Sequence, residues 1–112
     1  MASLTTHVLD TAGGKPAAGV MVELHEWRNG ARRLLRTFAT GADGRAAADQ
    51  VASGIYEFVF HAGDYFRATG LNLPEPPFLD EVVVRFGVAD PAAHYHVPLL
   101  LAPYSYSTYR GS

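Results

Sequence analysis

The chain has 112 residues, of which 48% are hydrophobic, with a formal net charge of −2 and no cysteine. This length is enough for one buried core and too short for a second, so we expect a single domain over residues 1–112. The lack of cysteine excludes disulfides, thiolate nucleophiles and cysteine-ligated zinc, and the nine Lys and Arg residues form no basic stripe, which argues against a nucleic-acid partner.

Short runs rich in β-branched and aromatic residues alternate with clusters of turn-forming residues, a pattern typical of a β-sandwich or barrel. Asp43-Gly44 predicts a tight turn that leaves Arg45 at the edge of a loop. A single short helix is expected over residues 65–69, with Asp64 as its N-cap. The predicted strands cover residues 4–9, 20–27, 33–40, 54–61, 81–86 and 94–101.

Five histidines are the first candidates for chemistry, because imidazole exchanges protons near neutral pH. His25 and His61 lie in predicted strands beside ordinary polar residues, so we expect structural or surface roles for them. In the last predicted strand, the alternation of a β-strand puts His94 and His96 on one face, while the residues between and after them point toward the core. The histidine-bearing face of this strand is therefore a possible site.

Three interpretations of that histidine pair remain open at this point. The first is two solvated side chains on an edge strand, since Pro98 cannot donate a backbone hydrogen bond and proline is tolerated mainly at edges or bulges. The second is a metal site, in which a third His or carboxylate completes the ligands. The third is catalysis, and the spacing alone does not decide among them.

The two ends of the chain carry the other candidates. His7 is a weak signal by itself, because the pattern of residues 4–9 does not clearly bury it. Residues 104–112 are dense in aromatic and hydroxyl side chains, whereas chain ends normally fray with small polar residues. Either a last strand packs its tyrosines on the sheet, or Arg110, Ser112 and the terminal carboxylate line a pocket.

Taken together, four blocks of this sequence closely resemble one family, the transthyretin-like 5-hydroxyisourate hydrolases of urate degradation. The blocks are LTTHVLDTA at residues 4–12, which Gly14-Lys-Pro16 follows, ADGR at 42–45, HYHVPLLL at 94–101 and YRGS at 109–112. Transthyretin itself, a hormone carrier with the same fold, lacks the first-strand histidine, the His-x-His pair and the Tyr-Arg-Gly-Ser ending. The sequence therefore favours the enzyme over the carrier.

The resemblance implies an all-β, transthyretin-like (prealbumin-like) sandwich of two four-stranded sheets with one short helix. It implies a homotetramer whose active sites lie where pairs of dimers meet, and a reaction that opens the ring amide of 5-hydroxyisourate to give 2-oxo-4-hydroxy-4-carboxy-5-ureidoimidazoline. We expect no cofactor, no metal, and no nucleic-acid or membrane partner. Because the first residues carry no signal-peptide pattern, a cytoplasmic location is expected.

The resemblance also assigns roles to individual residues. His7 and His96 are expected to activate water and transfer protons, Arg45 to stabilise the oxyanion, and Ser112 to orient the substrate or the water. A transthyretin-type carrier that binds a flat aromatic ligand in a central channel is the alternative function. The expected catalytic residues are His7, Arg45, His96 and Ser112, and the expected substrate-binding residues are His7, Arg45, His96, Tyr109, Arg110, Gly111 and Ser112.

Overall fold

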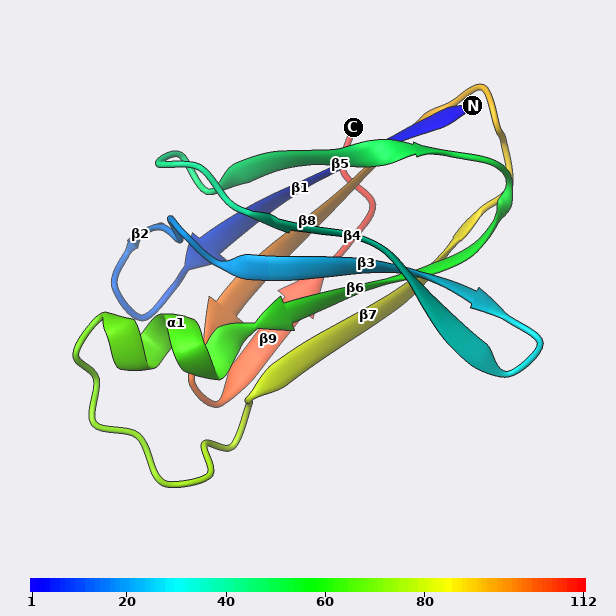
Figure 1. Ribbon diagram of the computed structural model, residues 1–112. Coiled ribbons are helices and arrows are strands. Elements are labelled where there is room, and N and C mark those ends of the chain that lie inside the picture. The colour runs from blue at the N-terminus through cyan, green and yellow to red at the C-terminus, as the bar shows by residue number, and fades with distance from the viewer.

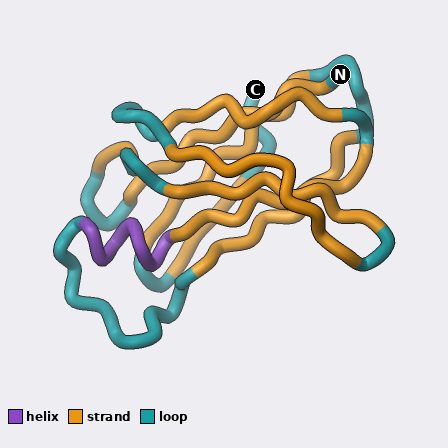
Figure 2. Tube along the Cα trace, in the orientation of Figure 1, coloured by secondary structure: helices purple, strands orange, loops and turns teal.

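The computed structural model describes residues 1–112 and consists of two β-sheets packed face to face, with one helix (Figure 1). Strands make up most of the chain, and the helix lies at the end of the sandwich away from the N-terminus (Figure 2). That helix has seven residues, and no helix is long and apolar enough to cross a membrane. In chain order the elements are β1 (Ala2–Asp10), β2 (Lys15–Pro16), β3 (Met21–Arg28), β4 (Ala31–Ala39), β5 (Arg45–Val51), β6 (Gly54–His61), α1 (Ala62–Ala68), β7 (Glu81–Val88), β8 (His94–Ala102) and β9 (Ser105–Thr108).

The predicted all-β sandwich is confirmed, with one difference in the strand count. One sheet has four strands in the order β4-β3-β6-β7, and the other has five, in the order β2-β1-β8-β9 with β5 also paired to β1. The fifth strand arises because β5 pairs with residues 2–7 of β1, while the two-residue β2 pairs with Leu9 and Asp10 farther along the same strand. Strands β5 and β2 therefore pair with successive parts of β1.

Buried and half-buried residues alternate strictly along strand β1. Its even-numbered residues are buried and its odd-numbered residues from Ser3 to Leu9 are half-buried, which is the period of a strand with one face on the core. Leu4 and Val8 are almost completely buried, and on β8 Leu99 and Leu101 are fully buried beside them. Burial of these apolar side chains against β3, β6 and β7 holds the two sheets together.

One local prediction was wrong. Helix α1 begins at Ala62 rather than at residue 65, and Asp64 lies within its first turn instead of capping it. The Asp64 carboxylate accepts a hydrogen bond from the Arg67 guanidinium at 3.1 Å. The reason is that β6 runs directly into the helix, where the Gly63 N–H donates to the Asp80 carbonyl at 2.9 Å. Of the three interpretations left open for the histidine pair, the edge strand does not hold, because β8 lies between β1 and β9.

Strand β5 was missed, since its alanine-rich sequence has weak β propensity. Arg45 is the first residue of this strand, directly after the turn, and so lies at the edge of the loop as predicted. The turn before it is as predicted: Gly44 has φ +78°, a conformation that favours glycine, and its carbonyl accepts the Val8 N–H at 2.8 Å. This bond fixes the start of β5 against β1.

Candidate active site

The face of the five-stranded sheet that points away from the core gathers the predicted residues from both ends of the chain. In the parallel pairing of β1 with β8, Thr5 lies opposite His96, and in the antiparallel pairing of β1 with β5, His7 lies opposite Arg45. Side chains at paired positions of neighbouring strands lie on the same face. The fold thus brings His7, Arg45 and His96 together across three adjacent strands.

A cleft of about 490 Å³ lies on this face. The interpretation of His94 and His96 as two solvated side chains on an edge strand does not fit, because β8 is an interior strand and both side chains line the cleft. The residues around it come from β1, the Asp43 turn, β5, β8 and the chain end: Thr5, Thr6, Asp43, Arg45, Ala46, Ala47, His94, His96 and Ser112.

A chain of hydrogen bonds joins the two histidines of β8 to β1. Nδ1 of His94 lies 2.6 Å from the Ser3 hydroxyl, and the Thr5 hydroxyl lies 3.0 Å from Nε2 of His94 and 2.8 Å from Nδ1 of His96. A hydroxyl has one proton, so Thr5 can donate to only one of these two ring nitrogens. When Nδ1 of a neutral His96 carries the ring proton, it donates to Thr5, and Nε2 is then the unprotonated nitrogen. When Thr5 donates to Nδ1 instead, the ring proton is on Nε2.

The surroundings of His96 favour its neutral form. Burial lowers the pKa of His96 from the ordinary 6.5, and the positive charge of Arg45 and the neighbouring His7 and His94 lower it further. A lowered pKa keeps the ring unprotonated at neutral pH, which is the state a proton acceptor needs.

His7 and Arg45 are both held by the Asp43 turn. Nε2 of His7 lies 3.0 Å from the Asp43 carbonyl oxygen, and because a carbonyl only accepts, Nε2 carries the proton and Nδ1 has the free lone pair when the ring is neutral. The backbone N–H of Arg45 donates to the Asp43 side chain at 3.0 Å. The turn therefore sets both the tautomer of His7 and the start of the strand that carries Arg45.

The C-terminus reaches the same face. The Gly111 N–H donates to the His96 carbonyl at 2.8 Å in an isolated antiparallel bridge, and the next residue, Ser112, lines the cleft. A Cβ atom at Gly111 would lie 2.6 Å from Cδ2 of His96, so only glycine allows this close approach. The reason for glycine here is contact with the His96 ring.

Two of the expected substrate-binding residues lie elsewhere in the single chain. Tyr109 and Arg110 line a separate cavity of about 390 Å³ between β7, β8 and β9. The Arg110 guanidinium lies 4.2 Å from the centre of the Tyr95 ring and donates to the His94 carbonyl at 3.2 Å. Within one chain Arg110 holds the tail against β8, and neither residue lines the cleft.

The site has further members that the sequence analysis did not name. Ser3 and Thr5 hold the β8 histidines, and Asp43 holds His7 and Arg45. Thr5 could have been found from its spacing, because it is two residues from His7 and so lies on the same face of the predicted strand. The partners of Ser3 and Asp43 depend on strand pairing, for which the local sequence has no signal.

Comparison with known proteins places these residues in a family. The family model described as HIUase/Transthyretin family matches residues 4–111. The chain belongs to this family. The match includes His7, Arg45 and His96 and ends one residue before Ser112.

Individual members of the HIUase/Transthyretin family are similar along nearly the whole chain. A protein of Rhizobium meliloti named 5-hydroxyisourate hydrolase 2 is 57% identical, with 97% of this chain and 95% of that protein covered. The structure of a 5-hydroxyisourate hydrolase from Klebsiella pneumoniae has a TM-score of 0.84 at 33% identity and covers 100% of both chains. A transthyretin from Sparus aurata has the same TM-score of 0.84 at 28% identity, with 96% of this chain and 95% of that chain covered.

Proposed function

We propose that this protein is a hydrolase that opens the ring amide of 5-hydroxyisourate to give 2-oxo-4-hydroxy-4-carboxy-5-ureidoimidazoline, in urate (purine) degradation. The observation that carries the proposal is the convergence of Arg45, His96 and Ser112 on one cleft, with His7 opposite Arg45 in the strand register. The relatives named 5-hydroxyisourate hydrolase support it. The reaction uses side chains of the protein alone, without a cofactor or metal.

In the proposed mechanism, a neutral His96 accepts a proton from the attacking water. When Nδ1 of His96 donates to Thr5, Nε2 is free to take that proton, and reversal of the Thr5 hydrogen bonds lets Nε2 donate instead. His7 has a defined acceptor, Nδ1, and supplies the second proton-transfer group. The two histidines can thus exchange the roles of base and acid during one turnover.

Arg45 is proposed to stabilise the negative charge that develops on the ring carbonyl oxygen. Its guanidinium presents planar donors, and its charge persists at any working pH. The same positive charge lowers the pKa of His96, so Arg45 also helps to keep that base unprotonated. Ser112 and the terminal carboxylate close the cleft and orient the substrate or the water.

The direct test is to generate 5-hydroxyisourate with urate oxidase and to follow its ultraviolet decay with and without this protein. We expect the protein to accelerate the decay in proportion to its concentration. A decay rate equal to that of a boiled control would overturn the proposal.

A carrier of a flat aromatic ligand is less well supported than the hydrolase. Transthyretin has the same fold, but the hydrolase relatives are more similar to this chain in sequence. The histidines and Arg45 that line or flank the cleft also give it polar, charged walls, whereas an aromatic ligand needs apolar ones. Tight binding of an aromatic ligand with no hydrolysis would favour the carrier.

We also propose that residues 1–112 form a single domain and that four chains associate as a homotetramer in the cytoplasm. Strand β9 is an unpaired edge of its sheet, and Tyr104, Tyr106 and Tyr109 near it are 61%, 44% and 59% exposed. Edge strands with exposed aromatic residues tend to pair with another chain. Sedimentation velocity at micromolar concentration should give the mass of a tetramer, and a monomer would contradict this part of the proposal.

The pH dependence of kcat/KM should report the lowered pKa of His96. Protonation of His96 removes the proton acceptor, and because its pKa in the folded protein is below 6.5, the neutral form persists to lower pH than for an exposed histidine. We therefore expect the acidic limb of the profile to have its midpoint below 6.5. Initial rates corrected for spontaneous decay, with circular dichroism at each pH to confirm folding, make the measurement. A midpoint above that value would contradict the base role of a neutral His96.

A further inference from the structure

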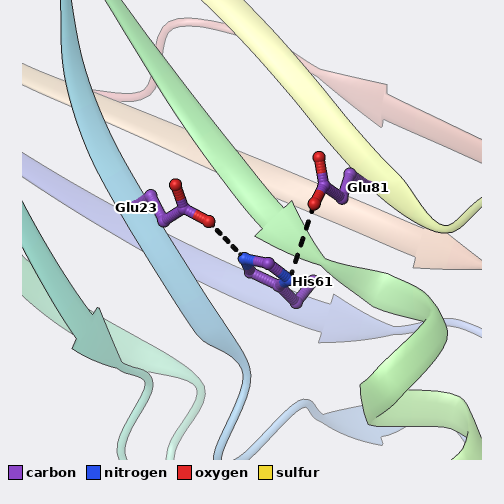
Figure 3. A group of neighbouring side chains, drawn as sticks. All are labelled: Glu23, His61 and Glu81. Atoms are coloured by element: carbon purple, nitrogen blue, oxygen red, sulfur yellow. Dashed lines mark hydrogen bonds and ion pairs between the residues drawn. The ribbon is translucent and has the colours of Figure 1, made fainter. Parts of the chain in front are cut away.

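A second cluster of titratable side chains lies on the four-stranded sheet, away from the cleft. Val22, Phe60 and Val82 of strands β3, β6 and β7 are buried in the core, so the residues directly before and after each of them point to the opposite face of this sheet. Glu23 follows Val22, His61 follows Phe60, and Glu81 precedes Val82. Figure 3 shows the His61 ring between the two carboxylates.

The strands bring these groups close together. Oε2 of Glu23 lies 2.5 Å from Nε2 of His61, and Oε1 of the same carboxylate lies 2.8 Å from Nε2 of His25. His61 is paired with Glu81 across β6 and β7, and its Nδ1 lies 4.0 Å from Oε2 of Glu81. Nδ1 also lies 3.8 Å from the Asp64 carboxylate, which comes from the first turn of α1.

We propose that Glu23, His61 and Glu81 bind a first-row divalent transition-metal ion such as Zn²⁺. One ligand atom from each residue lies within 4.8 Å of the other two. Around a tetrahedral Zn²⁺ with bonds of about 2.0–2.2 Å, ligand atoms are about 3.3–3.6 Å apart, so small side-chain movements suffice. The imidazole nitrogen favours such ions over Mg²⁺ and Ca²⁺, which prefer oxygen ligands alone.

The local charge favours a cation. Three carboxylates, Glu23, Glu81 and Asp64, surround His61, and Arg67 reaches only Asp64 among them. The two oxygens of the Glu23 carboxylate face the rings of His25 and His61, at 2.8 Å and 2.5 Å. A metal ion would replace the proton that Glu23 and His61 share, and His25 would keep hold of Glu23 in the way that outer partners orient metal ligands.

The site is accessible from solvent. A cavity of about 610 Å³ next to it is lined by Met21, His61 and Asp64, among others. The side chain of Glu81 is 51% exposed at the start of β7, so it can swing toward an entering ion. Asp64, with 72% of its side chain exposed, or a water can supply the fourth ligand.

The test is isothermal titration with ZnCl₂ at neutral pH. His7, His94 and His96 could bind zinc in the active-site cleft, so the titration uses a background variant with both His94→Asn and His96→Asn. In this background we expect one Zn²⁺ per chain, and Glu81→Gln should weaken its binding by about tenfold or more. Glu26→Gln is the matched control, because Glu26 lies on β3 of the same sheet and is paired with Arg33 at 2.9 Å, outside the cluster.

A second measurement identifies the ligand directly. The imidazole ¹⁵N resonances of His61 should shift on zinc addition in the background variant and remain unchanged with MgCl₂. The absence of zinc binding in that background, or equal affinity in the Glu81→Gln and Glu26→Gln variants, would overturn the proposal. Hydrolysis is measured separately with the Glu81→Gln variant after treatment with a chelator, because the cleft residues of this variant are intact. A failure of the metal site can then be distinguished from a failure of the proposed hydrolase activity.

Discussion

Replacement of His96 by Asn should lower the turnover number for 5-hydroxyisourate by about 10²-fold or more, the usual effect of removing a general base. Asparagine keeps a polar group near the position of Nδ1, so the bond to Thr5 at 2.8 Å can be kept while the proton acceptor is lost. His7→Asn and Arg45→Lys are expected to have effects of the same size. Initial rates of ultraviolet decay at saturating substrate measure the loss.

Arg45→Lys is the sharpest of these variants. Lysine keeps the positive charge but loses the planar fork of donors, so a large loss shows that directed hydrogen bonds to the oxyanion matter. The control is His25→Asn, which removes a histidine from the other sheet and should leave turnover unchanged. Turnover close to wild type in Arg45→Lys would mean that Arg45 supplies only a diffuse positive field.

The role of Thr5 can be separated from simple packing. Thr5→Val keeps the shape but removes the hydroxyl that bridges His94 and His96, so we expect turnover to fall and the acidic limb of the pH profile to move. Thr5→Ser restores the hydroxyl and should restore the profile. If Thr5→Ser behaves like Thr5→Val, Thr5 acts through its methyl group and not through the histidines.

Deletion of residues 109–112 should abolish hydrolysis without unfolding the protein. The core residues belong to earlier elements, and the tail contributes its bridge to His96 and the position of Ser112 in the cleft. The loss is measured as turnover, while thermal melting and sedimentation confirm that the fold and the oligomeric state are kept. Full activity in a truncated protein of unchanged melting temperature would overturn the role of the tail.

Two smaller changes at the C-terminus test whether the exact position of the tail matters, and not only its presence. Gly111→Ala puts a methyl group where a Cβ atom would lie 2.6 Å from the His96 ring, so it should displace the ring or the tail and lower turnover. Addition of one residue after Ser112 moves the terminal carboxylate and should also lower turnover. A frayed tail with no role would tolerate both changes.

The parts of the fold that could be predicted are those with a strong local pattern. Alternation in β8 indicated which face of this strand meets the core, and this assignment was confirmed by the burial of Tyr95, Val97, Leu99 and Leu101. Strand β5 was missed because alanine at residues 46–48 has no β signal, and pairing with β1 supplies what local propensity does not.

The site was predictable only in part, because some of its contacts depend on how distant parts of the chain pack. The two ends of the chain carried long, specific motifs, so the resemblance pointed to His7, His96 and Ser112. The sequence had no signal for the placement of Tyr109 and Arg110 over β8, because that depends on how the tail crosses its neighbour. The sequence also had no signal for the contact between Glu23 and His61, because strand pairing brings these two residues together.

The parallel pairing of β1 with β8 also determines when during synthesis the protein can become active. Thr5 and His96 are separated by 91 positions in the sequence. At about 5–20 residues per second, a ribosome needs about 5–18 s to add that stretch. During this time the first strand has no β8 to pair with, and its apolar residues depend on transient contacts or chaperones for protection. A ribosome that stalls before β8 would release a product without His94, His96 or the tail, so such partial translation products are expected to carry no hydrolase activity.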